Sequence, residues 1–189
     1  MIDHFALLDQ PRRPWLDQDA LKQQFHRLTA EHHPDVNATP QVEFSSVTAA
    51  YRLLSDPKTR LKHLIELEFP EAPEGGNNVP KELVELFMQV AGALSIYGKL
   101  LKKLEAATIP LTQALIANEK REVLEQLQKL AHAISALEAT GLEQLKQLDQ
   151  AWLIDKPALL VPLIGLGQKL AFLQKWADQI REAMLRLQM

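Results

Sequence analysis

The tripeptide His33-Pro34-Asp35 places an imidazole and a carboxylate on either side of a proline. Because Pro34 disfavours a helical conformation in the residue before it and fixes the direction of the chain, we expect a helix to end near His33. Both polar side chains should then be exposed beside the end of that helix. A rigid corner with one donor–acceptor group and one carboxylate suits insertion into a partner's hydrogen-bond network. It suits catalysis poorly, because no nucleophile or second acid–base group is paired with it.

A polar stripe leads up to this corner. At 100° per residue, Lys22 and His26 lie within about 40° of the position of His33, and Arg27 widens the same face. The apolar residues of the segment form a second stripe about 100° away. One face of this helix is therefore expected in a core, while the neighbouring face can present hydrogen-bond donors to an acidic partner.

The elements that must hold this corner are helices. Apolar residues recur every three or four positions along most of the chain, and few windows alternate with period two. The first segment, 1–69, predicts a short leading turn, a helix from position 17 or 18 to near 33 and a second helix from about 40. Asp56 and Pro57 then predict the cap and first position of a third helix. The predicted core residues of this segment are Phe5, Leu7, Leu8, Leu21, Phe25, Leu28, Phe44, Val47, Tyr51, Leu54, Leu61, Leu64 and Ile65.

A stretch rich in proline, glycine and asparagine over 70–80 is predicted to be a linker. The segment after it, 81–189, has long seams with alternating spacings of four and three residues, which indicate an antiparallel helical bundle or coiled-coil hairpins. Breaks are expected at Pro110, at Thr140-Gly141 and over 155–157. Whether the apolar residues of 142–152 form a helix of their own or continue the preceding one stays open. The predicted fold class is all-α.

Composition excludes several kinds of site. The 189 residues carry a formal net charge of −3 and no cysteine, so a disulfide framework, a thiolate metal centre and a cysteine nucleophile are absent. Neither segment is strongly basic, so nucleic acid is not an expected partner. His26, His32 and His33 do not share one helical face with a carboxylate, and we expect no metal and no cofactor. The longest apolar run, 158–166, is half of a bilayer span, and a cytoplasmic protein with no membrane contact is expected.

The stretch from Leu21 to Asp35 resembles the second helix and loop of a J domain. Later, Ala50-Tyr51-Arg52-Leu53-Leu54-Ser55-Asp56-Pro57 resembles the end of that family's third helix. The two motifs stand in the correct order, and the resemblance covers roughly 3–68. It implies docking on the nucleotide-binding domain of a DnaK-class heat-shock chaperone and stimulation of its ATPase. The positions that carry this role over are Lys22, His26, Arg27, His33, Pro34 and Asp35.

The order of a short J domain (1–69), a brief linker (70–80) and a helical bundle (81–189) is similar to that of HscB-type co-chaperones of iron–sulfur cluster assembly. Residues 60–67 also resemble the end of the J domain in that group. This resemblance implies a DnaK/HscA-class chaperone and an IscU-type scaffold as partners, the scaffold being bound by the first long helix of the bundle. The matching client-binding residues, which we expect to form an exposed patch, are Leu83, Leu86, Phe87 and Val90.

Three hypotheses result from these patterns. The first is a non-enzymatic co-chaperone that stimulates a DnaK-class ATPase and delivers an iron–sulfur scaffold. The second keeps the J domain but gives the bundle a different client. The third is a helical adaptor protein in which the tripeptide is coincidental.

Overall fold

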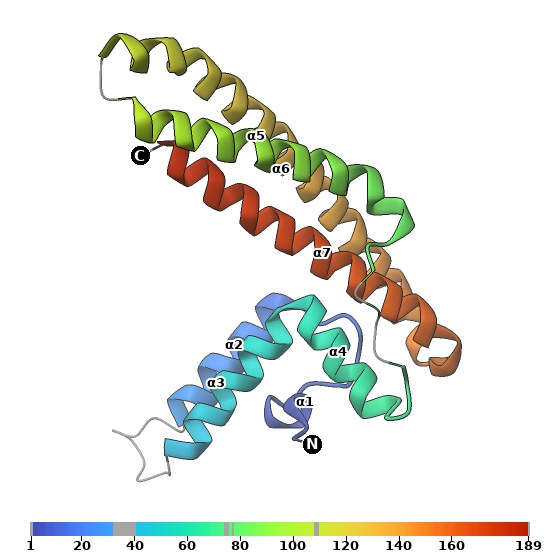
Figure 1. Ribbon diagram of the computed structural model, residues 1–189. Helices are drawn as coiled ribbons and strands as arrows, with labels where there is room; N and C mark the ends of the chain where they lie inside the picture. The colour runs from blue at the N-terminus through green and yellow to red at the C-terminus, as the bar shows by residue number, and fades with distance from the viewer. Residues whose placement is uncertain (1, 32–40, 74–75, 77, 108–109, 189) are drawn as a thin grey trace. The chain divides into compact units, whose positions relative to one another are not determined.

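The computed structural model describes residues 2–31, 41–73, 76, 78–107 and 110–188, and the side chains of 41–43, 110–113 and 115 also lie outside the description. All regular elements in the described ranges are helices, which confirms the all-α prediction (Figure 1). The chain divides into two compact units. The first comprises 1–76 with 142–168, and the second comprises 77–141 with 169–189.

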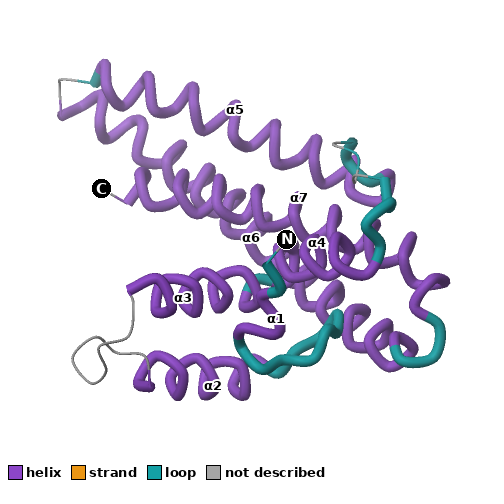
Figure 2. The backbone as a smooth tube through the Cα atoms, turned by 90° about the horizontal axis from the view of Figure 1, so that it is seen from below, coloured by secondary structure: helices purple, strands orange, loops and turns teal. Residues whose placement is uncertain are grey.

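Four helices from the N-terminal part build most of the first unit. They are α1 (His4–Leu7), α2 (Gln18–Glu31), α3 (Gln41–Ser55) and α4 (Pro57–Glu68). Helices α2 and α3 pack side by side, and α1 packs against α3 (Figure 2). The helices that were predicted from position 17 or 18, from about 40 and from Pro57 are therefore all present.

Local capping explains where two of these helices begin. The carboxylate of Asp17 accepts a hydrogen bond from the backbone N–H of Ala20 at 2.8 Å, and that of Asp56 accepts one from Lys58 at 3.0 Å. Such caps satisfy N–H groups that have no partner within the helix. Pro57 has no backbone N–H group, so at the first position of α4 it leaves no donor unsatisfied. The predicted core residues that are buried in this part are Phe5, Leu8, Leu21, Leu28, Val47, Leu54, Leu61 and Leu64.

The second unit is built from three long helices and a short 3₁₀ turn, η1 (Lys81–Leu83). The helices are α5 (Val84–Ala106), α6 (Pro110–Trp152) and α7 (Lys156–Gln188), of which α6 contributes its part up to 141 and α7 its part from 169. On α6 the buried residues from Val123 to Ile134 are those of the predicted seam, whereas on α5 the buried positions include Leu86, Ala93 and Leu100, and the expected Leu94, Tyr97 and Leu101 are only partly buried. The core of this unit consists of Leu83, Leu86, Val90, Ala93, Leu100, Ala107, Ile116, Val123, Leu127, Leu130, Ile134, Leu173, Trp176, Ile180, Ala183 and Leu187.

One predicted break is wrong. Helix α6 continues through Thr140 and Gly141, so residues 142–152 extend it and do not form a separate helix. The hydroxyl of Thr140 donates to the carbonyl of Ala136 at 2.9 Å, an interaction that leaves the helix intact. Gly141 is buried and lies on the same stripe as the buried Ile134 and Leu145, so the packing of its apolar neighbours outweighs the low helix propensity of glycine.

The two units differ in extent from the three segments predicted from the sequence. Residues 142–168, which the sequence placed in the bundle, belong to the compact unit of the N-terminal helices, and that unit extends to Gly76. This segment contains the end of α6, a turn and the beginning of α7. The first unit is therefore more than an isolated set of four short helices.

Helices over 81–106 and 156–188 are long and apolar enough to cross a membrane by length and composition alone, each with a mean hydropathy of 1.3 in its most apolar window. Core helices of soluble proteins pass the same test. The buried residues of both helices recur at three- and four-residue spacing, as expected for packing within a bundle. These two helices do not therefore indicate a membrane protein.

Candidate functional site

The predicted docking face lies on the outside of α2. Lys22, His26 and Arg27 are all exposed, whereas Leu21 and Leu28 are buried on the neighbouring stripe. The structure thus separates the polar and apolar faces as the periodicity predicted. The corner residues of the site, His33, Pro34 and Asp35, lie outside the described residues, so their role stays a prediction.

Packing between α2 and α3 fixes the orientation of this face. Phe25 stacks on Tyr51 with ring centroids 4.2 Å apart and an interplanar angle of 17°. Next to it, the ring of His26 lies 5.6 Å from that of Phe25. The stacked pair joins the middle of α2 to α3, so the exposed side chains of α2 project from a supported helix.

Among the described docking residues, Arg27 is held by two ion pairs within the chain. Its guanidinium pairs with the carboxylate of Asp9 at 3.1 Å and with that of Glu31 at 3.0 Å. Its Nε also donates to the side-chain oxygen of Gln24 at 3.2 Å. The charge of this arginine is therefore already shared with two carboxylates of the same chain.

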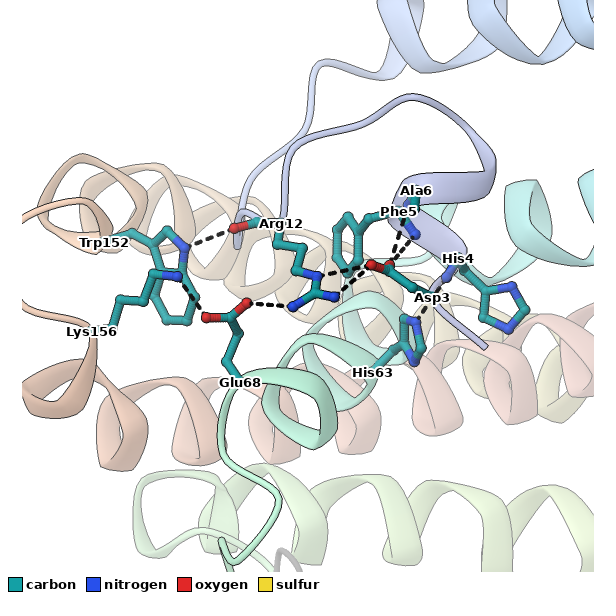
Figure 3. A network of polar contacts seen from close by, with 9 residues as sticks. All are labelled: Asp3, His4, Phe5, Ala6, Arg12, His63, Glu68, Trp152 and Lys156. Carbon is teal, nitrogen blue, oxygen red and sulfur yellow. Dashed lines mark hydrogen bonds and ion pairs between the residues drawn. The ribbon is translucent and has the colours of Figure 1, made fainter. Parts of the chain in front are cut away.

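A network of ion pairs attaches the N-terminal turn to the rest of the first unit (Figure 3). Arg12 pairs with Asp3 at 2.7 Å and with Glu68 at 3.2 Å, and Lys156 pairs with the other oxygen of Glu68. The indole N–H of Trp152 donates to the backbone carbonyl of Arg12 at 2.8 Å. These contacts join α1, the segment before α2, the end of α4 and the turn between α6 and α7.

The carboxylates in this network are held in their ionised form. Burial would by itself raise the pKa of Asp3, but the hydrogen bonds from Arg12 and from two backbone N–H groups of α1 outweigh it and lower that pKa. Burial likewise opposes ionisation of Glu68, and the hydrogen bonds from Lys156 and Arg12 outweigh it and lower the pKa of Glu68. The network is therefore stable at neutral pH.

A second contact joins the segment before α2 to the end of α6. The carboxylate of Asp149, which is 8% exposed, accepts hydrogen bonds from Arg13 Nε at 3.1 Å and from Arg13 Nη2, a bidentate arrangement. It also accepts one from the backbone N–H of Trp15 at 3.2 Å. A buried carboxylate is rare without such partners.

Arg60 is a buried cation inside the first unit, only 1% exposed. Its Nε donates to the carbonyl of Pro14 at 2.9 Å and its Nη1 to that of Leu54 at 2.6 Å. Burial lowers the pKa of Arg60 to about 10, while the charges of Asp56 and Asp149 act in the opposite direction. The guanidinium stays charged at neutral pH and links the segment before α2 to the end of α3.

The predicted client-binding residues fall on two faces of the beginning of α5 and the turn before it. Leu83, Leu86 and Val90 are buried in the core of the second unit, whereas Phe87 is 40% exposed. The exposed patch expected from the sequence therefore contains only one of the four. The large apolar side chains that α5 does expose near Phe87 are Val84 and Met88.

An aromatic cluster supports this surface. The ring of Phe87 lies 6.0 Å from that of Trp176, and the ring of Phe172 lies 5.7 Å from the same indole. Trp176 is buried and Phe172 is half-buried. We use the name α5 patch for the three exposed apolar residues at the beginning of α5, Val84, Phe87 and Met88.

Sequence reasoning missed several of these contacts. Nothing in the local sequence distinguishes Asp9, Arg13 and Asp149 from other charged residues, and their partners lie up to 136 residues away in the chain. The one signal that the sequence offered was the position of Asp149, at which a charge interrupts an otherwise apolar stripe that continues from Leu145 to Trp152.

Comparison with known proteins agrees with this geometry. The DnaJ domain family matches residues 3–63. Over 60 residues, the chain is 40% identical to chaperone protein DnaJ 2 of Thermus thermophilus, a match that covers 31% of this chain and 21% of that protein. Over 63 residues, it is 36% identical to the chaperone protein DnaJ of Dictyoglomus thermophilum, covering 32% and 16%. The match thus spans about a fifth or less of these relatives.

Solved structures extend the similarity beyond the DnaJ domain. The chaperone HscB from Vibrio cholerae superposes with a TM-score of 0.63 at 20% identity, covering 98% of this chain and 99% of that one. The human co-chaperone protein HscB superposes with a TM-score of 0.58 at 17% identity, covering 96% and 81%. The chain therefore carries a DnaJ domain over residues 3–63. Over nearly its whole length, it has the fold of HscB co-chaperones.

Proposed function

We propose that this protein is a co-chaperone that binds a DnaK/HscA-class chaperone through its J domain and stimulates the ATPase of that partner. The observation that carries this proposal is the DnaJ domain at 3–63, whose second helix exposes Lys22, His26 and Arg27 together. Exposed cations on one helical face complement an acidic surface. The related proteins are named chaperones and co-chaperones, and we infer that the chain itself catalyses no reaction.

A steady-state ATPase assay tests this step. The full chain is added in increasing amounts to a purified DnaK-class chaperone, and the ATPase rate is followed with the wild type and with His33→Gln. Stimulation should be lost or strongly reduced in His33→Gln, because the side chain proposed to enter the partner's hydrogen-bond network is changed. Asn78→Ala, an exposed change outside the DnaJ domain, is the matched control and should stimulate like the wild type. Equal stimulation by His33→Gln and wild type would reject the docking role.

We further propose that the second unit binds an IscU-type iron–sulfur scaffold and delivers it to the chaperone in the cytoplasm. The support for this finer function is the fold shared with HscB co-chaperones together with the exposed α5 patch. The patch offers an aromatic ring and two aliphatic side chains backed by buried Trp176, an arrangement common at the centres of protein interfaces.

Binding of purified scaffold, measured by calorimetry, tests this second step. Phe87→Ala should weaken binding at least tenfold, as expected when a central aromatic residue is truncated. Ile96→Ala is the control, because Ile96 lies on the same helix with a similar exposure, 42% against 40%, and about 180° around the axis from Phe87. Leu86→Ala is unsuitable, since it would open a cavity in the core. Equal affinities of Phe87→Ala and wild type would remove the scaffold assignment for this patch.

A J-domain protein with a different client is the second candidate function. It is favoured by the exposed positions next to the α5 patch, Ala91 and Gly92, which carry neither charge nor bulk. A surface of this kind favours an apolar partner surface over one recognised through ion pairs. In the calorimetric experiment, failure of the wild type to bind any iron–sulfur scaffold would favour this candidate.

A further inference from the structure

The segment after α1 lays a carboxylate on the docking face of α2. The Oδ2 atom of Asp9 accepts hydrogen bonds from Gln24 Nε2 at 2.8 Å and from Arg27 Nη2 at 3.1 Å. Both donors lie on α2, about one turn apart. Asp9 is therefore positioned on the guanidinium that the docking surface would offer to a partner.

The backbone at Asp9 is unusual. Its φ angle is 50°, and it is the one non-glycine residue with positive φ in the described part of the chain. Glycine adopts this left-handed region without strain, and aspartate tolerates it better than most other residues. Asp9 is held there by the turn that ends α1: its N–H bonds to the carbonyl of Ala6, and the next residue, Gln10, bonds to that of Phe5 at 2.9 Å. Phe5 and Leu8 are fully buried and anchor this turn.

The pairing leaves Arg27 with all three guanidinium nitrogens in use. Besides Asp9 on Nη2, Glu31 accepts from Nη1 at 3.0 Å and Gln24 from Nε at 3.2 Å. A carboxylate of another protein must displace one of these acceptors before it can make a bidentate pair with Arg27. Asp9 and Arg27 are both more than half exposed, so the pair is accessible and reversible.

We propose that Asp9 is an intramolecular competitor that occupies Arg27 and thereby limits the affinity of the J domain for the acidic surface of its chaperone. This inference rests on the proposed docking function and adds a residue that sets its strength. An exposed ion pair of this kind changes an equilibrium by about two- to fivefold.

The experiment is a titration of the chaperone ATPase with the full chain, read as the concentration that gives half-maximal stimulation. Asp9→Asn keeps a residue that tolerates positive φ and removes the charge. We expect this concentration to fall about two- to fivefold at low salt, and less so at high salt, because added ions screen exposed charges. Glu71→Gln, which removes an exposed acidic charge elsewhere in the first unit, should leave it unchanged.

The double variant Asp9→Asn/Arg27→Ala identifies the cause. If Asp9 acts by occupying Arg27, Asp9→Asn has no effect once Arg27 is replaced. An unchanged or higher half-maximal concentration for Asp9→Asn, or an equal gain in the Arg27→Ala background, overturns the inference while leaving chaperone docking in place. Failure of the wild type to stimulate any DnaK-class ATPase overturns the proposed function, and the inference with it.

A measurement on the free protein gives an independent check. The exchange of the Arg27 Nη2 protons with solvent, followed by NMR, should be faster in Asp9→Asn than in the wild type, because these protons lose the carboxylate that accepts from them. Equal exchange in both forms would show that Asp9 does not restrain Arg27 and would overturn the proposal.

Discussion

Among the single acidic residues described above, replacing Asp149 by Ala should lower the free energy of unfolding the most. The substitution removes two hydrogen bonds from the Arg13 guanidinium and one from the backbone N–H of Trp15. Hydrogen bonds to charged groups contribute about 1.5–3 kcal/mol each and neutral ones about 1 kcal/mol. The side chain of Arg13 is 34% exposed and regains part of its hydration when the partner is lost. We therefore expect a loss of about 2–4 kcal/mol, below the range of about 3–5 kcal/mol for fully buried pairs.

Thermal unfolding of the full chain, followed by tryptophan fluorescence, measures this loss. For a chain of this size, 2–4 kcal/mol corresponds to a decrease in Tm of roughly 5–15 °C. Glu143→Ala is the matched control on the same helix: Glu143 pairs with Lys146 three residues away, both are exposed, and the change should stay within about 0.5 kcal/mol.

The reasoning would be refuted by equal Tm values for Asp149→Ala and Glu143→Ala. A double-mutant cycle adds a second criterion. If the energy resides in the pair, the losses from Arg13→Ala and Asp149→Ala are not additive in the combined variant. Additive losses would show that Asp149 acts through packing alone.

Two further predictions concern one residue of each unit. His63, which is buried, accepts a hydrogen bond from the backbone N–H of His4 at 3.2 Å, so its Nε2 must be unprotonated. Burial is the main cause that lowers the pKa of His63 below its ordinary value, and the neighbouring His4 is the second. At a pH near the ordinary pKa of histidine, the unfolded chain therefore binds more protons than the folded one. The free energy of unfolding should consequently fall as the pH drops below about 6.5. Urea unfolding at pH 7.5 and 5.5 should show a larger decrease in this free energy for the wild type than for His63→Gln. Equal decreases in the two proteins would contradict this account. Gly98→Ala in α5 adds a methyl group that has no atom within 4 Å apart from its own chain neighbours and the adjacent helix backbone. The change should stabilise the helix by about 0.5–1 kcal/mol and so raise Tm, whereas a lower Tm would show an unrecognised contact at that position.

The helices of the first unit could be predicted because their signals are local. Asp56 and Pro57 mark a helix start through the chemistry of two adjacent residues, and the structure has the cap at that place. The course of α6 beyond position 140 was harder to predict, because glycine, as at Gly141, is a residue type that often ends a helix. A single glycine costs a helix only about 1 kcal/mol, which the packing of the flanking apolar residues outweighs.

The site was predicted only as far as one helix determines it. The exposed face of α2 follows from periodicity, but the pairing of Arg27 with Asp9 depends on a turn 18 residues away in the chain. On α5, the sequence placed Leu83, Leu86 and Val90 in a patch although the same spacing also made Leu83 and Val90 part of the bundle seam. Three residues on a packed face cannot also face a client, and only Phe87 combines partial exposure with contact to the core.

The three tryptophans are distributed so that each unit carries its own fluorescent reporter. Trp15 and Trp152 belong to the first unit and Trp176 to the second. Trp152 and Trp176 are both buried, so their emission should shift to longer wavelength when the surrounding unit opens. A variant that keeps Trp176 alone and another that lacks only Trp176 would follow the two melting events independently. Coincident curves would mean that the whole chain opens cooperatively, and separate curves would rank the two halves by resistance to heat.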